Sequence, residues 1–310
     1  RRGAVLFRAA ARGAQAVRRA FVPARRLLDL RADLDGFLAG EDLNGFQRWI
    51  VESLYTLSVP ELSFPVRSLL IVLTPRWVSR DITFTIGERA YTFPTTSAGM
   101  GKETGPGAVA RRLAAEGLRV AYAPNLPAKR LAVCAGLAAY GRNNIAYAPG
   151  MGSFFRILPF FTDAVCEKDP WRPMETMACC GKCESCVAAC PTGAIRPDRF
   201  LIDNQRCLTG VNEYLGAEEF PDWIPLDAHH LVVECLKCQW ACPANAPYLG
   251  NVGPPVRFDE AETKALMGGV PYGEMLPGLR EKIDDLEWKK YLPVIPRNVR
   301  ALLRGAGFKG

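Results

Sequence analysis

The chain has 310 residues, of which 49% are hydrophobic and 23% charged, a balance that excludes a disordered or fibrous protein. Its net charge of +7 rests on eight arginines within residues 1–28, a stretch without acids; the other 282 residues carry a net charge of −1. A basic nucleic-acid-binding face spread over the folded body is therefore excluded. The longest apolar run, residues 131–140, has ten residues, too few for a membrane-spanning helix. Without a secretory signal pattern, the sequence predicts a cytoplasmic protein.

Residues 1–59 form a helical N-terminal segment by their pattern. Residues 4–56 are expected to form helices broken at Pro23 and around residues 41–44. The arginine-rich start fits an RNA-binding arm, a membrane-surface helix, a targeting peptide or a surface helix with a solvated arginine face.

Residues 60–165 have the pattern of a mixed α/β domain. A compact β-type run is followed by two strands that alternate with period two and join at Gly87-Glu88 as a hairpin. Strands are expected at 67–74, 81–86, 90–93, 118–123, 144–147 and 153–161, and helices at 107–117 and 126–140. The glycine-rich segment 97–107 lacks the P-loop spacing, so we interpret it as a flexible loop or a loop that covers a ligand.

Residues 166–250 are rich in cysteine and are expected to form short loops and turns. Residues 251–310 are expected to form a C-terminal extension of loops rich in Pro and Gly, with a helix from about 284 to 303. The sequence therefore predicts an α+β protein in which an α/β domain precedes a double-cluster domain.

Two cysteine runs carry the strongest chemical signal. Residues 180–191 read CGKCESCVAACP, with the spacing C-x2-C-x2-C-x3-C-P, and residues 235–243 read CLKCQWACP. Three cysteines at intervals of three can wrap one four-iron cluster, and a fourth points toward a second cluster. With Cys207 between the runs, the chain supplies eight thiolates, which is enough for two [4Fe–4S] clusters and predicts electron transfer.

The same spacing predicts which cysteines share a cluster. In the bacterial two-cluster arrangement the fourth cysteine of a run binds the other cluster. The first cluster would then be held by Cys180, Cys183, Cys186 and Cys242, and the second by Cys190, Cys207, Cys235 and Cys238. Cys179 breaks this spacing, so we expect it to be a neighbour and not a ligand.

Other interpretations of the cysteines and other candidate sites fit less well. Zinc sites use separated C-x2-C pairs, and disulfide frameworks belong to short secreted chains, whereas this chain has 11 cysteines. Cys134 lies in an apolar helical pattern and is expected to be a buried thiol. His229 and His230, the only histidines, are expected at the surface or at a helix cap, and they are too few for a histidine-based catalytic site.

Two segments upstream of the cysteines point to a family. Residues 126–144 read LPAKRLAVCAGLAAYGRNN and are followed by Gly150-Met-Gly-Ser-Phe-Phe155 and Phe161-Thr-Asp163. This order resembles the AGLG-x-x-G-K-N, GSF and TD segments of epoxyqueuosine reductases, which precede a double cluster. Cys190-Pro-Thr-Gly-Ala-Ile195 and Arg206-Cys207-Leu208 also resemble that family. The similarity covers roughly residues 118–250, and the wider group includes reductive dehalogenases.

The resemblance implies a nitroreductase-like α/β domain that binds cobalamin, whose cobalt the two clusters reduce. The residues that would line the corrinoid or its tail are Gly141, Arg142, Asn143, Asn144, Gly152 and Ser153. Their glycines would allow backbone approach, and their Asn and Arg side chains would offer donors.

The chain departs from the family pattern at three places. The position of the family's proton-donating carboxylate falls on Tyr122, which could donate a proton or be an ordinary strand tyrosine, and no Asp or Glu occurs between Glu116 and Asp163. Arg142 replaces the family's lysine. The helical-repeat tail that grips tRNA is expected to be replaced by the last 60 residues.

Three functions follow from these patterns. The leading one is an iron–sulfur oxidoreductase, similar to epoxyqueuosine reductases, that passes electrons to a corrinoid and reduces an unknown substrate. The alternatives are a ferredoxin-like carrier or partner subunit without its own catalytic site, and a tRNA-modifying epoxyqueuosine-type reductase. Electrons would come from a ferredoxin, a flavodoxin or an artificial reductant.

Overall fold

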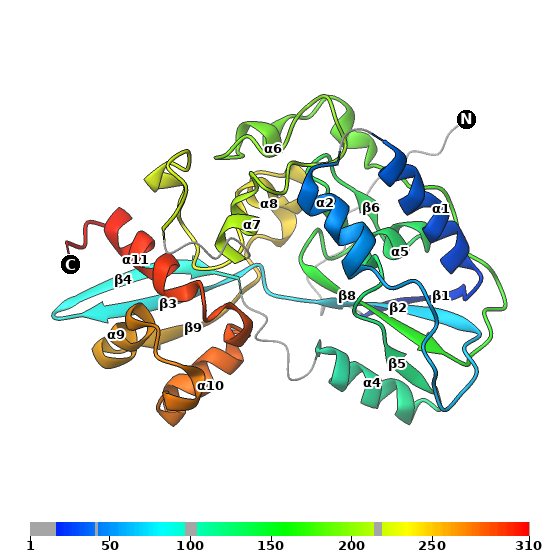
Figure 1. Cartoon of the computed structure of the whole chain (residues 1–310), viewed down its shortest axis with the longest axis horizontal. Helices are drawn as coiled ribbons and strands as arrows, with labels where there is room; N and C mark the ends of the chain where they lie inside the picture. The colour runs from blue at the N-terminus through cyan, green and yellow to red at the C-terminus, as the bar shows by residue number, and fades with distance from the viewer. Residues whose placement is uncertain (1–16, 41–42, 97–103, 214–218, 310) are drawn as a thin grey trace. The chain divides into compact units, whose positions relative to one another are not determined.

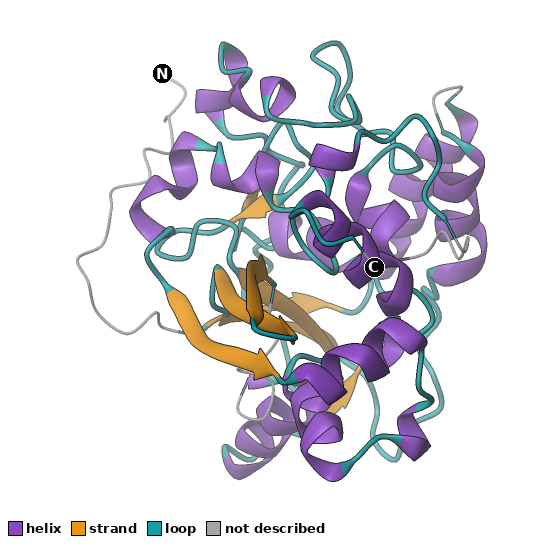
Figure 2. Cartoon of the chain, turned by 90° about the vertical axis from the view of Figure 1, so that its left-hand side faces the viewer, coloured by secondary structure: helices purple, strands orange, loops and turns teal. Residues whose placement is uncertain are grey.

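The computed structural model describes residues 17–40, 43–96, 104–213 and 219–309. They combine helices and strands (Figure 2), as expected for a mixed α/β chain. The N-terminal arm up to residue 16 and most of the glycine-rich segment, 97–103, lie outside the described residues. No helix in the described ranges is both long and apolar enough to cross a membrane.

The chain divides into two compact units. The first unit comprises Arg1–Pro75, Lys102–Glu184 and Pro197–Leu201, and the second comprises Arg76–Gly101, Ser185–Arg196 and Ile202–Gly310. The elements of the first unit (Figure 1) are β1 (Arg18–Pro23), α1 (Arg26–Ala39), α2 (Gly45–Trp49) with a π-helical turn (Ile50–Leu54), β2 (Ser68–Pro75), α4 (Pro106–Ala115), β5 (Val120–Tyr122), α5 (Ala128–Cys134), β6 (Ala139–Tyr140), β7 (Ala146–Tyr147) and β8 (Phe155–Thr162).

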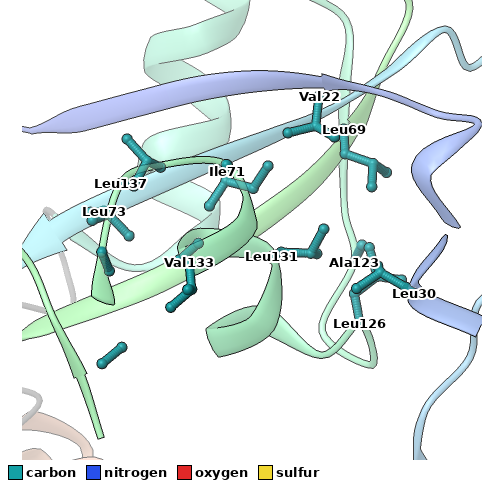
Figure 3. Close-up of a cluster of buried hydrophobic side chains, with 14 of the residues drawn as sticks. Val22, Leu30, Leu69, Ile71, Leu73, Ala123, Leu126, Leu131, Val133 and Leu137 are labelled. Atoms are coloured by element: carbon teal, nitrogen blue, oxygen red, sulfur yellow. The ribbon is translucent and has the colours of Figure 1, made fainter. Parts of the chain in front are cut away.

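The first unit is built on an antiparallel sheet with the strand order β1-β2-β8-β5. Side chains of β2 alternate between its two faces, because successive residues of a strand point to opposite sides. Leu69, Ile71 and Leu73 pack with residues of α1 and α5 (Figure 3), whereas Leu70 and Val72 pack with residues of α4. Both faces are covered, which explains why this strand is apolar without interruption.

Two sequence predictions for the first unit were wrong. Residues 18–23 form β1 and not a helix, because Phe21 and Val22 pack on opposite faces of the sheet. The helix expected at 126–140 ends at Cys134, because Gly136 adopts φ 75°, a left-handed conformation that terminates helices.

Part of the arginine-rich start is described, and three of its arginines are paired with acids. Arg19 is ion-paired with Glu116, and Arg25 and Arg26 both contact the Asp169 carboxylate, at 2.7 and 2.9 Å. In the described part of the segment, these arginines therefore belong to the fold and not to a free basic arm.

The second unit joins a small sheet to helices. Its elements are β3 (Ser79–Ile86), β4 (Arg89–Thr95), α6 (Ser185–Ala188), α7 (Leu208–Glu213), α8 (Lys237–Trp240), β9 (Val252–Phe258), α9 (Glu260–Gly268), α10 (Pro277–Asp285) and α11 (Ile295–Gly305). The hairpin β3–β4 turns at Gly87-Glu88 as predicted, and β9 pairs with β3 in parallel. Figure 1 shows α9 beside this sheet.

A stack of aromatic rings forms the centre of the second unit. The rings of Phe84 and Phe258 are 5.3 Å apart, and Trp288 stacks on Phe258 at 6.0 Å. Helices α9, α10 and α11 contribute buried aliphatic side chains around this stack. The C-terminal residues are therefore part of this core.

The sequence did not predict β9 or α9, since residues 251–283 were expected to be loops. β9 contains Pro254 and Pro255, which cannot donate hydrogen bonds, yet it is an edge strand with a register shift, a position where proline is tolerated. The Pro254 carbonyl accepts a 2.6 Å bond from Arg80, a buried arginine that also pairs with Asp285.

Candidate iron–sulfur centre

A tight hairpin in the first unit supports the start of the cysteine-rich segment. Strands β6 and β7 pair through Tyr140 and Ala146, and residues 141–144 form the turn. The Tyr140 backbone accepts a bond from Met177 and donates one to Glu175, both 2.8 Å long. The Met177 carbonyl then accepts from the Cys180 N–H, at 3.0 Å. The hairpin thus fixes the chain where the first cysteine run begins.

The side chain of Arg142, at the tip of this hairpin, binds backbone carbonyls of residues 180–183, which we call the ligand loop. Its guanidinium donates to the carbonyls of Cys180 at 2.6 Å and Cys183 at 3.1 Å, with a longer bond of 3.3 Å to Gly181. A further bond of 2.9 Å reaches the Pro197 carbonyl. One side chain therefore satisfies carbonyls from two segments of the first unit.

Three of the residues predicted to bind a corrinoid have other roles in this structure. The Arg142 donors contact the ligand loop, and the Asn143 amide, 2% exposed, donates to the Tyr147 hydroxyl at 2.9 Å. A Cβ at Gly141 would lie 2.6 Å from both Asn143 and Tyr147, so this glycine serves internal packing. Arg142, Asn143 and Gly141 as placed do not fit a corrinoid-binding role, and we derive no chemistry through that group.

The other three predicted corrinoid residues shape the local backbone. Asn144 adopts φ 57° and accepts from the Lys129 ammonium through its backbone and side-chain oxygens, at 2.8 and 3.0 Å. Gly152, also at φ 57°, accepts at its carbonyl from the Ala148 N–H, and Ser153 is 5% exposed. Their role toward a cofactor stays a prediction.

In the second unit, three predicted ligands of one cluster lie together. Burial raises the pKa of Cys207 above the ordinary thiol value, and the neighbouring Cys190 charge adds to the rise. Burial also raises the pKa of Cys235 to about 12, with Cys207 and Cys190 again adding to it. Three thiolates this close repel one another unless cationic iron neutralises them.

Backbone N–H groups surround these sulfurs. The Ala194 N–H donates to Cys190 Sγ at 3.2 Å, residues 209 and 210 donate to Cys207, and the Lys237 N–H donates to Cys235. Hydrogen bonds to thiolate sulfur are one means by which proteins stabilise iron–sulfur clusters and set their potentials. The donor set therefore fits a four-iron cluster held by Cys190, Cys207 and Cys235.

The remaining predicted ligands are distributed over both units. Cys180 and Cys183 belong to the first unit, and Cys186, Cys238 and Cys242 to the second. Within the second unit, α6 with Cys186 packs against α8, which carries Cys238 and ends just before Cys242. In the described residues no three Cys, His, Asp or Glu side chains are grouped to hold one shared metal ion. A four-iron cluster needs only that each thiolate reach its own iron, so the eight-ligand set stays a prediction from spacing.

Two residues on α11 that the sequence did not single out support the segments next to these cysteines. Asn298, 2% exposed, donates to the carbonyls of Asn212 at 2.9 Å and Val232 at 2.6 Å. Arg297, 5% exposed, donates to the Val211 carbonyl at 2.8 Å and lies over the Phe220 ring. The sequence places Arg297 and Asn298 in the expected C-terminal helix, but their burial with polar partners is a tertiary feature that one sequence does not show.

The other candidates from the sequence have clear positions. Tyr122 is 41% exposed on β5, its ring lies 5.6 Å from Phe160, and burial raises its pKa. His229 is half-buried against Phe220, and burial lowers its pKa to about 4, so it is neutral near pH 7. Cys134 is buried with a pKa raised to about 11, as expected of an inert thiol, whereas Cys179 is exposed.

Comparisons with known proteins agree with these motifs. A family model described as "4Fe-4S double cluster binding domain" matches residues 179–245. An epoxyqueuosine reductase of Francisella cf. novicida is 34% identical over 119 residues, which is 37% of this chain and 31% of that protein. That of Pseudomonas aeruginosa is 34% identical over 123 residues, 38% of this chain and 31% of that protein. The matched part thus spans about a third of the length of these relatives.

Solved structures show the same fold. An epoxyqueuosine reductase with a modified tRNA-Tyr stem loop covers 92% of this chain, with 20% identity and a TM-score of 0.57; 76% of its own chain is matched. The Bacillus subtilis enzyme gives a TM-score of 0.54 at 19% identity, with 92% of this chain and 77% of its own chain covered. Residues 179–245 therefore match a double four-iron cluster binding domain. In sequence and fold the chain is similar to epoxyqueuosine reductases, which confirms the resemblance stated from the sequence.

Proposed function

We propose that this chain is an oxidoreductase of the epoxyqueuosine-reductase type, whose cysteines hold two [4Fe–4S] clusters for electron transfer. The observation that carries the proposal is the convergence of Cys190, Cys207 and Cys235, each with backbone donors to its sulfur, within the double-cluster segment. When bound, a four-iron cluster supplies reversible transfer of one electron at a time. The protein supplies the thiolates, their spacing and their hydrogen bonds.

The substrate we propose is an epoxide-bearing nucleoside in tRNA. Support comes from the solved relative described with an epoxyqueuosine-modified tRNA stem loop, together with the sequence similarity to enzymes of that name. Removing an epoxide oxygen as water consumes two electrons and two protons, which two one-electron centres can deliver in successive steps. A low-potential donor such as a ferredoxin or a flavodoxin would refill them.

This chain has no carboxylate at the position where the family pattern places its proton donor. The Bacillus subtilis relative is described with its catalytic aspartate loop swung out of the active site. Here no Asp or Glu lies between Glu116 and Asp163, and Tyr122, whose pKa is raised, is the residue at the position predicted from the family. A phenol with a raised pKa keeps its proton at neutral pH and can donate it only to a strongly basic centre.

The alternative is a ferredoxin-like carrier, which would hold the same clusters without acting on tRNA. One anaerobic experiment separates the two. The purified chain is assayed for iron, reduced with dithionite, and incubated with an epoxyqueuosine-containing stem loop, with and without hydroxocobalamin, and the nucleosides are identified by mass spectrometry.

The expected result is about eight irons per chain and loss of the epoxide oxygen from the stem loop. Eight irons without turnover under either condition would overturn the reductase proposal and favour the carrier. Turnover only with hydroxocobalamin would support a corrinoid cofactor and contradict the conclusion that Gly141, Arg142 and Asn143 do not fit one. If Cys180→Ser and Cys238→Ser both left the iron content unchanged, the cluster assignment itself would be wrong.

A further inference from the structure

Arg142 is the residue of the hairpin tip whose charged side chain is hydrogen-bonded to the ligand loop. Its Nε and Nη atoms contact carbonyls on both sides of the Cys180–Cys183 turn, and a fourth bond reaches Pro197. No carboxylate is paired with it in the contacts described, so its partners are neutral dipoles. Its positive charge is therefore not cancelled locally.

We propose that Arg142 is a positioning residue for the cluster bound by Cys180 and Cys183, and that its charge raises the reduction potential of that cluster. The inference rests on the proposed two-cluster function. It assigns to Arg142 a different role from the cofactor-tail contact that the family resemblance implies.

The positioning part follows from how the loop is held. Backbone bonds at Tyr140 fix the chain as far as Met177, and the Cys180 N–H donates to the Met177 carbonyl. Beyond that point the carbonyls of Cys180, Gly181 and Cys183 are held by Arg142. A planar guanidinium can donate to several carbonyls at once, whereas a lysine ammonium is a single point charge on a flexible stem. The backbone of the hairpin thus fixes the chain before Cys180, and the side chain of Arg142 fixes the residues that follow.

The electrostatic part follows from the charge itself. Reduction adds one negative charge to a cluster, and a nearby cation stabilises the reduced state more than the oxidised state. The Arg142 side chain is half-buried, so water screens it less than an exposed charge. Removing the charge should lower the potential of this cluster.

The test compares Arg142→Gln, Arg142→Lys and the control Arg130→Gln in the anaerobically purified protein. Arg130 is also a partly buried arginine of the first unit, but it is bonded to the Asp33 carboxylate and not to the ligand loop. Iron content is measured first, and the midpoint potentials of both clusters follow from a dye-mediated titration monitored by EPR.

In Arg142→Gln we expect one of the two potentials to fall, or a loss of roughly half the iron if the loop no longer retains its cluster. Arg142→Lys should restore the potential toward the wild-type value while retaining iron less well than wild type. Arg130→Gln should change neither quantity. The proposal is overturned if Arg142→Gln keeps full iron and both potentials, or if Arg130→Gln produces the same change. Wild-type protein without iron would instead refute the proposed function.

Discussion

The side-chain amide of Asn298, on the last helix, donates a 2.6 Å hydrogen bond to the carbonyl of Val232, three residues before Cys235. The same amide donates to the Asn212 carbonyl at 2.9 Å, and Asn212 in turn donates to the Glu234 carbonyl at 2.8 Å. Asn212 lies on α7, which follows Cys207 directly. The network therefore fixes the helix after Cys207 relative to the segment that carries Cys235, and it is anchored by α11.

Replacing Asn298 with Ala should weaken the second cluster. The change leaves two buried carbonyls without their donor, which costs about 1–3 kcal/mol each before relaxation, and it loosens the arms of Cys207 and Cys235. We expect the iron content to fall from about eight toward four irons per chain. The measurement is the rate of iron release to a chelator, monitored by absorbance.

Arg300→Ala is the matched control for that experiment. Arg300 lies on the same helix and also donates to a carbonyl, the partly buried one of Met267 at 2.6 Å, but its partner belongs to α9. It should lower stability without accelerating iron release. Equal iron loss in the two variants would show that α11 acts only through general stability.

The register of the first cysteine run can be tested at Cys179. The spacing selects Cys180 as the ligand, and Cys179 is exposed. We expect Cys179→Ser to retain full iron, whereas Cys180→Ser loses about half of it. In the intact holoprotein iodoacetamide should modify Cys179 but not Cys134, whose burial raises its pKa to about 11. Iron loss in Cys179→Ser would reverse the register.

Local patterns in the sequence were sufficient for much of the fold. The apolar run of β2, the alternation of β3 and β4 and the Gly87-Glu88 turn are all local signals, and each was predicted. The strand β1 was not, because its arginines favour a helix while its pairing with β2 is a tertiary contact. β9 was not predicted because it contains two prolines, which are depleted in strands and tolerated at edge strands.

The candidate site shows the same division. The spacing of the cysteines is visible in the sequence itself, so a set of ligands could be predicted without any knowledge of the fold. The residues that hold the ligand arms act across long separations: Arg142 reaches Pro197, and Asn298 reaches Asn212. Such pairs leave no periodic trace in one sequence. The interpretation of Arg142 as a corrinoid contact came from the family pattern, which does not say whether a donor is already engaged.

Glu213, at the end of α7, should make stability depend on pH. Burial, followed by repulsion from Glu234, raises its pKa from 4.5 to about 7, although Lys290 and Tyr291 oppose the shift. The folded chain keeps this proton up to about pH 7, whereas the unfolded chain releases it near 4.5. Its contribution is therefore complete below pH 4.5 and is lost as the pH rises through 7.

Glu213→Gln should remove this loss. Between pH 5.5 and 8 the free energy of unfolding of the wild type should fall by on the order of 2 kcal/mol, whereas that of the variant should not show this fall. The measurement is the apparent melting temperature of both proteins at each pH, followed by circular dichroism. Glu260→Gln is the control, since Glu260 is exposed and its partner Lys264 lowers its pKa, so nothing changes in this pH range. Parallel pH profiles for wild type and Glu213→Gln would contradict the assignment.

Gly141→Ala should disturb the ligand loop without touching any ligand. The added methyl group would meet Asn143 Oδ1 and Tyr147 Cε2 at 2.6 Å, closer than real Cβ contacts allow, so the turn that presents Arg142 must shift. Overpacking of this kind typically costs 1–3 kcal/mol. Gly150→Ala is a useful comparison because it strains a left-handed glycine at φ 80° yet meets no atom within 4 Å. If the hairpin tip holds the loop through Arg142, only Gly141→Ala should speed iron release and lower one cluster potential, as Arg142→Gln does. Iron release at the same rate from both glycine variants would mean that backbone strain, and not the position of Arg142, controls retention.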